Sequence, residues 1–120
     1  MGYTTEFRGG FDIKPPMTRK DVFDFEDTYE GKRFNPATAP GYYCQWQVTD
    51  DGTTLQWDGG EKFYNYTEWL RKVLDEFFEP RGYVVIGEVK FRGEEFSDAG
   101  TLVVKYSNRT CKHTVSERRG

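Results

Sequence analysis

The chain has 120 residues, which suits a single domain, and 18% of them are aromatic. Its formal net charge of −3 argues against general nucleic-acid binding, and no apolar run is long enough for a membrane helix. The first residues lack the apolar segment of a signal peptide, so we expect a cytoplasmic protein with reduced cysteines. We expect one α+β domain over residues 1–106, followed by a polar tail over residues 107–120.

The first strand and the first helix are predicted from two different periods. Residues 3–13 alternate with a period of two, which predicts a long strand with one buried face. The double glycine at residues 9–10 predicts a bend or bulge within that strand. Thr18 and Asp21 are then spaced as the N-cap and third residue of a helix. Three residues of this helix share an apolar face: Val22, Phe25 and Tyr29.

A hairpin and a second helix follow. Residues 44–48 and 55–58 alternate on either side of an Asp-Gly turn, which is a strong β-hairpin signal. Asn65 and Glu68 have the spacing of a capping box at the start of a helix. Apolar residues then recur at helical spacing, which predicts a buried stripe of Tyr66, Trp69, Leu70, Val73, Leu74, Phe77 and Phe78.

The last strands are predicted at residues 84–92 and 101–106, on either side of an acidic turn. The tail either frays or adds a short edge strand over residues 112–115. The order is therefore β-α-β-β-α-β-β, with both helices on one face of an antiparallel sheet, as in a ferredoxin-like fold. The opposite face of the sheet is left to solvent or to a partner.

Constellations for catalysis or metal binding are weak in this sequence. One histidine, His113, and two cysteines far apart in the chain lack the spacing of a zinc site, and we expect a solvated His113 in the tail. Cys44 alternates with Trp46 on the apolar side of its strand, so we expect a buried structural thiol. The paired acids lie in turns, where solvation is expected. We therefore predict no catalytic residue, no metal, no cofactor and a protein that is not an enzyme.

Binding remains, and the predicted open face supplies charged side chains for it. The candidates for ligand or partner contact are Arg8, Tyr42, Tyr43, Trp57, Tyr64, Lys90 and Arg92. The three basic residues would pair with phosphate groups, and Trp57 or Tyr64 would stack against a base. Tyr42 and Tyr43 lie in a loop that we expect beside the sheet, as aromatic residues do in recognition surfaces. An ordinary solvated face is the alternative for the same residues.

Three segments resemble a set of small proteins from bacteriophages and from bacterial, especially actinobacterial, genomes. They are MGYTTEFRGGFDIKPPMT at the start, CQWQVTDDGTTLQWDGGEKFYNYTEWL in the middle and GYVVIGEVKFRGEE near the end. The resemblance implies no activity and no site residues. It implies a setting, namely a phage accessory protein that acts in the host cytoplasm.

Three functions follow from these observations. The preferred one is a non-enzymatic accessory protein that binds and blocks a host protein, such as a defence effector. The second is a small-nucleotide or signal-molecule binding protein that sequesters its ligand. A hydrolase using Glu88, Glu94 or Asp98 is the third and has the least support. A homodimer would cover the open face in each case.

Overall fold

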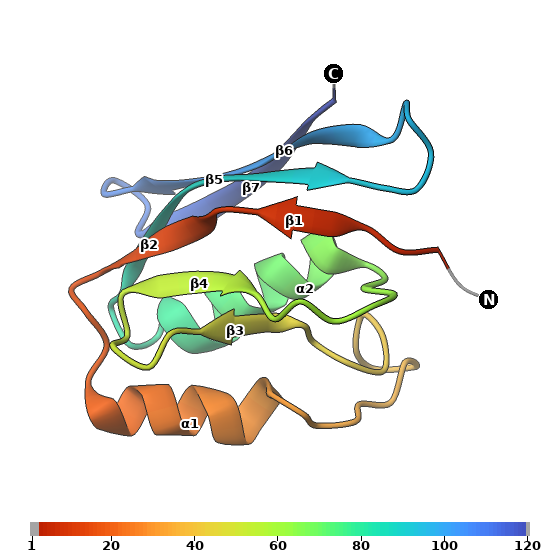
Figure 1. Ribbon diagram of the computed structural model, residues 1–120. Helices are drawn as coiled ribbons and strands as arrows, with labels where there is room; N and C mark the ends of the chain where they lie inside the picture. Colours follow the sequence, from red (N-terminus) through yellow and green to blue (C-terminus); the bar gives the residue numbers. More distant parts are fainter. Residues whose placement is uncertain (1–2, 120) are drawn as a thin grey trace.

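The computed structural model describes residues 3–119 (Figure 1). It is an α+β structure in which two helices pack on a seven-stranded antiparallel sheet. The strands are β1 (Glu6–Arg8), β2 (Gly10–Lys14), β3 (Trp46–Val48), β4 (Thr54–Trp57), β5 (Val84–Arg92), β6 (Ala99–Ser107) and β7 (Lys112–Arg119). The helices are α1 (Arg19–Tyr29) and α2 (Tyr66–Val73), and α2 continues into a π-helical turn, η1 (Leu74–Phe78). No helix within residues 3–119 is long and apolar enough to cross a membrane.

The sheet has the strand order β3-β4-β2-β5-β6-β7, and β1 pairs with β5 as well. β1 and β2 are the two parts of the predicted first strand. Arg8 lies opposite Lys90 and Asp12 lies opposite Ile86, so both parts keep one register against β5. Gly9, with a φ of 98°, therefore bends the strand without inserting a residue. The sheet has more strands than the sequence predicts, because the first strand is divided into β1 and β2 and the predicted tail forms β7, which extends well beyond residues 112–115.

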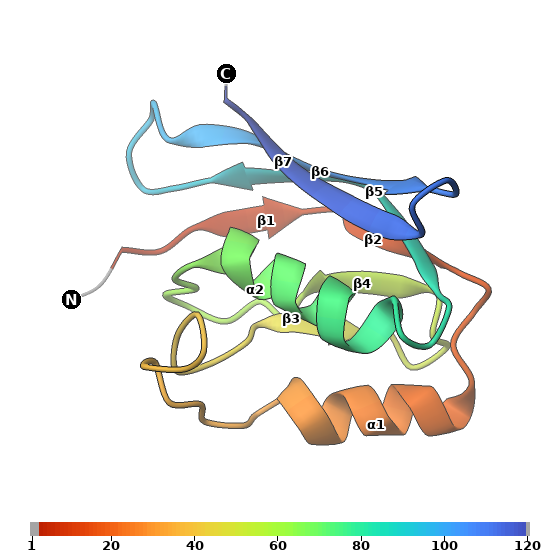
Figure 2. The ribbon, with the colours of Figure 1, turned by 180° about the vertical axis from the view of Figure 1, so that it is seen from behind.

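Both helices lie on the same side of the sheet (Figures 1 and 2). α1 begins as predicted, because the Thr18 hydroxyl accepts a hydrogen bond from the N–H of Asp21 at 3.1 Å. The predicted capping box of α2 is wrong. Asn65 has a left-handed backbone, with a φ of 56°, and its side-chain amide donates to the carbonyl of Pro40 instead. The loop before β3 is thereby tied to the start of α2.

Aromatic rings fill the space between the helices and the sheet, as the sequence predicts. Phe25 of α1 is completely buried and meets Phe77 edge to face, with ring centroids 5.2 Å apart. Trp46 of β3 and Phe11 of β2 are also completely buried, with ring centroids 5.8 Å apart. Six residues of the predicted α2 stripe are buried, and Tyr66 packs partly buried against the same core.

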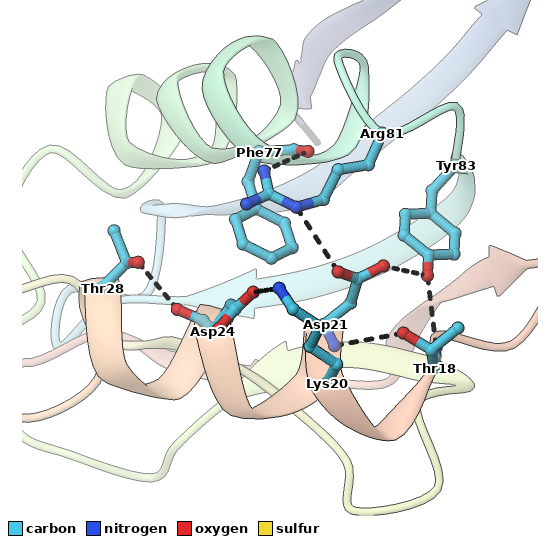
Figure 3. A network of polar contacts seen from close by, with 8 residues as sticks. All are labelled: Thr18, Lys20, Asp21, Asp24, Thr28, Phe77, Arg81 and Tyr83. Atoms are coloured by element: carbon cyan, nitrogen blue, oxygen red, sulfur yellow. Dashed lines mark hydrogen bonds and ion pairs between the residues drawn. The ribbon is translucent and has the colours of Figure 1, made fainter.

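A polar network ties the start of α1 to the segment between η1 and β5 (Figure 3). The Tyr83 hydroxyl donates to the Asp21 carboxylate at 2.5 Å and accepts from the Thr18 N–H at 3.2 Å. Arg81 lies 3.6 Å from the same carboxylate and covers the Phe77 ring, 3.8 Å from its centroid. These contacts join the cap of α1 to the beginning of β5.

The expectation of a solvated His113 is wrong, because its side chain is only 1% exposed. Its Nε2 accepts the N–H of Val85 at 2.9 Å, and its Nδ1 lies 2.9 Å from the Glu79 carboxylate. Nε2 must therefore be unprotonated, and Nδ1 carries the proton that it donates to Glu79. The imidazole reaches the start of β5 just before the point where β5 begins to pair with β6.

Carboxylates also bond to backbone groups at both edges of the sheet. At the β3 edge, the N–H of Val48 donates to Glu30 at 3.3 Å. At the β7 edge, the N–H of His113 donates to Glu79 at 2.6 Å, and Arg71 donates to the carbonyl of Val115 at 3.1 Å. These side chains occupy backbone positions that a further strand would need for pairing.

Candidate functional site

One row of side chains crosses the outer face of the sheet, which is the face away from the helices. Arg8 of β1 lies opposite Lys90 of β5, and Lys90 lies opposite Thr101 of β6. Thr101 in turn lies opposite Arg118 of β7. Neighbouring strands are about 4.8 Å apart, so the row spans about 15 Å. Figure 1 shows β1, β5 and β6 running side by side in this part of the molecule.

The row lies in an open groove of about 570 Å³. Arg92 stands two residues beyond Lys90 on the same face of β5, and Glu6 lies opposite Arg92. Four cationic side chains of the groove point toward solvent on this face: Arg8, Lys90, Arg92 and Arg118. Arg119 also lines the groove, but its guanidinium is paired with Asp98.

The cations of the groove are only partly neutralised by nearby carboxylates. Arg118 forms an exposed ion pair with Glu88 at 3.0 Å, which contributes little to stability because both groups are hydrated. Arg8, Lys90 and Arg92 form no ion pair with any carboxylate of residues 3–119. Unpaired cations on neighbouring strands favour an anionic ligand. A guanidinium group can donate two parallel hydrogen bonds to the oxygens of one phosphate.

The seven predicted contact residues fall into two groups. Arg8, Lys90 and Arg92 come together in the groove. The four aromatic residues do not line it: Tyr42, Tyr43, Trp57 and Tyr64. The Trp57 ring packs 5.4 Å from the Phe7 ring, and its indole N–H donates to Gln45. Trp57 is therefore partly buried and held by packing contacts away from the groove.

Tyr42, Tyr43 and Tyr64 are about half exposed, at 49%, 52% and 52%. They belong to the loop before β3 and to the segment before α2, which meet where Asn65 bonds to Pro40. The expectation that this loop lies beside the polar sheet face is wrong, because the loop packs against the helix side of the molecule (Figure 2).

Two residues near the groove were not among the predicted contact residues. Arg118 lies in the segment predicted as a tail, although the alternation of Thr114, Ser116 and Arg118 with Val115 and Glu117 is a strand signal. Phe96 lies in the turn predicted between the last two strands, and Arg92 covers its ring at 5.1 Å. The sequence signal for Phe96 was a single aromatic residue among acidic residues in a predicted hairpin turn.

The acids and thiols outside the groove are explained by local structure. Cys44 is buried as predicted, and burial raises the pKa of its thiol to about 12. Hydrogen bonds from Thr49 and Thr53 lower the pKa of Asp51. The same hydrogen bonds hold the turn between β3 and β4 together. Within residues 3–119 no three His, Cys, Asp or Glu side chains are grouped to hold a metal ion.

A second groove, of about 460 Å³, lies beside the start of α2. Its polar side chains are engaged with one another and with the backbone. Thr67 donates to Glu117 at 2.8 Å, and Arg71 pairs with Glu68 and with the Val115 carbonyl. This leaves fewer free groups for a ligand than the cationic groove has.

Comparison with protein-family models, with curated proteins and with solved structures finds no match to this chain. The cationic groove offers guanidinium, ammonium and hydroxyl donors on a rigid sheet. This arrangement can bind a multiply charged anion and hold it against the outer face.

Proposed function

We propose that the protein is a non-enzymatic binding protein that holds a multiply charged phosphate ligand in the cationic groove. One observation carries the proposal: Arg8, Lys90 and Arg92 converge in a single groove without an ion-pair partner in residues 3–119. The groove volume of about 570 Å³ lies in the range of small-ligand sites. Thr101 adds a hydroxyl between the cations of β5 and β7.

The arrangement of charge supports a phosphate ligand over a single carboxylate. Arg8 and Lys90 lie directly opposite each other, and Arg118 lies two strands from Lys90, about 10 Å away. Like charges on opposed positions repel, so this pair destabilises the empty sheet slightly. An anion with two or more charges relieves this repulsion, which adds to its binding.

The groove lies where β6 and β7 extend the rest of the fold. Strands β3, β4, β2 and β5 with the two helices follow the β-α-β-β-α-β order, and we keep the ferredoxin-like comparison as a proposal for that part. Thr101 and Arg118 come from the two added strands. The extension therefore supplies part of the proposed site.

Calorimetric titration with inorganic pyrophosphate tests the proposal, at low ionic strength where exposed charges are least screened. Arg8→Ser and Lys90→Ser should each weaken binding about tenfold or more, as expected for loss of a charge-assisted hydrogen bond. Lys105→Ser is the matched control, because Lys105 is an exposed cation of β6 outside the groove. Wild-type protein that does not bind pyrophosphate, or a Lys105→Ser variant that loses binding equally, would contradict the proposal.

A second candidate function is binding to a host protein and blocking it, as the resemblance to bacteriophage proteins suggests. The exposed aromatic residues Tyr42, Tyr43 and Tyr64 support it, because aromatic side chains dominate the energetic centres of protein interfaces. Immobilised protein should then capture one host protein, and the triple alanine variant of these tyrosines should not. Equal capture by the Lys90→Ser variant would separate this surface from the groove.

A further inference from the structure

The turn between β5 and β6 carries a phenylalanine that lies outside the core. Phe96 is 86% exposed, the largest fraction among the exposed large apolar side chains of residues 3–119. The turn joins two strands that line the cationic groove. Arg92, the last residue of β5, has its guanidinium carbon 5.1 Å from the centroid of the Phe96 ring. The ring is not part of the groove lining, but it lies against Arg92, which is.

The backbone on both sides of Phe96 is held by hydrogen bonds. The N–H of Gly93 donates to the Asp98 carbonyl at 2.7 Å, and the N–H of Asp98 donates to the Glu95 carbonyl at 3.0 Å. From the N-terminal segment, the Tyr3 hydroxyl donates to the Asp98 carboxylate at 2.8 Å and accepts from the Glu95 N–H at 3.0 Å. A turn held in this way presents Phe96 at a defined place, which lowers the entropy cost of binding to it.

The charges around the turn divide the site into two ends. Asp98 is engaged by Tyr3 and Arg119, and the Glu94 carboxylate accepts the N–H of Thr4. Glu95 adds a further carboxylate beside Phe96, so a phosphate is not favoured at the turn. A flat, uncharged group is favoured there instead, while the negative charge of the ligand belongs in the groove on the other side of Arg92.

We propose that the ligand of the groove is a nucleotide, with its phosphates on Arg8, Lys90 and Arg118 and its base stacked on Phe96. This inference rests on the proposed function for its phosphate part. An aromatic ring stacks with any base, because every base has a flat π face, and a guanidinium beside the ring adds a cation–π contribution. Phe96 thus takes the stacking role that the sequence assigns to Trp57 or Tyr64.

The test compares ADP with inorganic pyrophosphate by calorimetric titration of the wild-type protein and of Phe96→Ser. ADP should bind the wild type about tenfold more tightly than pyrophosphate, since stacking on an aromatic ring is worth about 1–3 kcal/mol per base. Phe96→Ser should remove this advantage and leave the affinity for pyrophosphate unchanged. Phe23→Ser is the matched control, because Phe23 is 70% exposed on α1 and lies outside the groove. Both variants change exposed side chains, and circular dichroism checks that they fold.

Failure of the nucleotide inference alone gives a different result from failure of the phosphate groove. If pyrophosphate binds and ADP binds no more tightly, the nucleotide inference is wrong while the phosphate groove stands. The same holds if Phe96→Ser still binds ADP more tightly than pyrophosphate. If neither probe binds the wild type, both are wrong. If an oligothymidylate of ten residues binds more tightly than ADP, the groove holds a polymer and the nucleotide inference is again wrong.

Discussion

The two faces of the same sheet use neighbouring residues in opposite ways. On β5, Phe91 points into the core, whereas Lys90 and Arg92 on either side of it point outward into the groove. The inner face is crowded with rings that contact one another. The outer face holds cations with few partners. The comparison shows that one strand stabilises the fold with alternate residues and leaves the others free for binding.

The largest expected effect is in the aromatic core that the inner face of the sheet and the helices share. Phe25→Ala should lower the free energy of unfolding by about 3–5 kcal/mol, because a completely buried ring leaves a cavity among Tyr29, Phe77 and Phe78. Guanidinium denaturation measures this change. Phe23→Ala on the same helix is the control and should change stability by less than about 0.5 kcal/mol. Equal effects of the two variants would contradict the packing described here.

An intermediate effect is expected at the β7 edge, where an acid bridges the inner core and an edge strand. Glu79→Ala should cost about 2 kcal/mol, because it removes the acceptor for the His113 N–H and imidazole, and hydrogen bonds to charged groups are worth about 1.5–3 kcal/mol. Urea denaturation at neutral pH measures the loss. Glu61→Ala, in an exposed loop, should cost almost nothing. A similar cost at both positions would remove the special role of Glu79.

The same contact predicts a dependence on pH. Burial raises the pKa of Glu79, but hydrogen bonds from the backbone N–H and the imidazole of His113 outweigh it, so the pKa in the folded protein lies below the ordinary 4.5. A lowered pKa means that the stabilisation is present above about pH 4.5 and is lost as the pH falls through the folded value. Between pH 5 and pH 3, thermal unfolding should show that Glu79→Gln loses less stability than the wild type. A parallel loss in both proteins would show that Glu79 does not contribute.

The smallest expected effect on stability lies on the outer face. Lys90→Glu should raise the free energy of unfolding by a few tenths of a kcal/mol, because it replaces a repulsion across the strands from Arg8 by an attraction. The same change should abolish pyrophosphate binding. Thermal unfolding and calorimetry on one preparation measure both. A loss of more than about 1 kcal/mol would mean that Lys90 supports the fold.

The elements that depend on local periodicity could be predicted from the sequence. The hairpin around Gly52 and the buried stripe from Trp69 to Phe78 follow from spacing alone, because packing on one face imposes the period. The features that depend on residues far apart in the chain could not be predicted from the sequence. Asn65 bonds to Pro40, and His113 is buried through Val85 and Glu79, residues far from it in the chain.

The candidate site shows the same division. Alternation alone places Arg8, Lys90 and Arg92 on one face, so their shared orientation could be predicted. That Arg118 completes the row depends on β7 pairing in register with β6, which no local pattern specifies. That Tyr42, Tyr43 and Tyr64 lie outside the groove could not be predicted, because periodicity does not tell which side of the molecule a loop packs against.

The carboxylates at the two margins of the sheet have a consequence for how copies of this protein meet in concentrated solution. Glu30 and Glu79 hold main-chain donors that an incoming strand from another molecule would have to capture first. Fibril growth by pairing of strands from two molecules must therefore begin by displacing a carboxylate, Glu30 at the β3 edge or Glu79 at the β7 edge. Colloidal stability should accordingly be better near neutrality than in acid, where those oxygens take up protons and hold the amides less firmly.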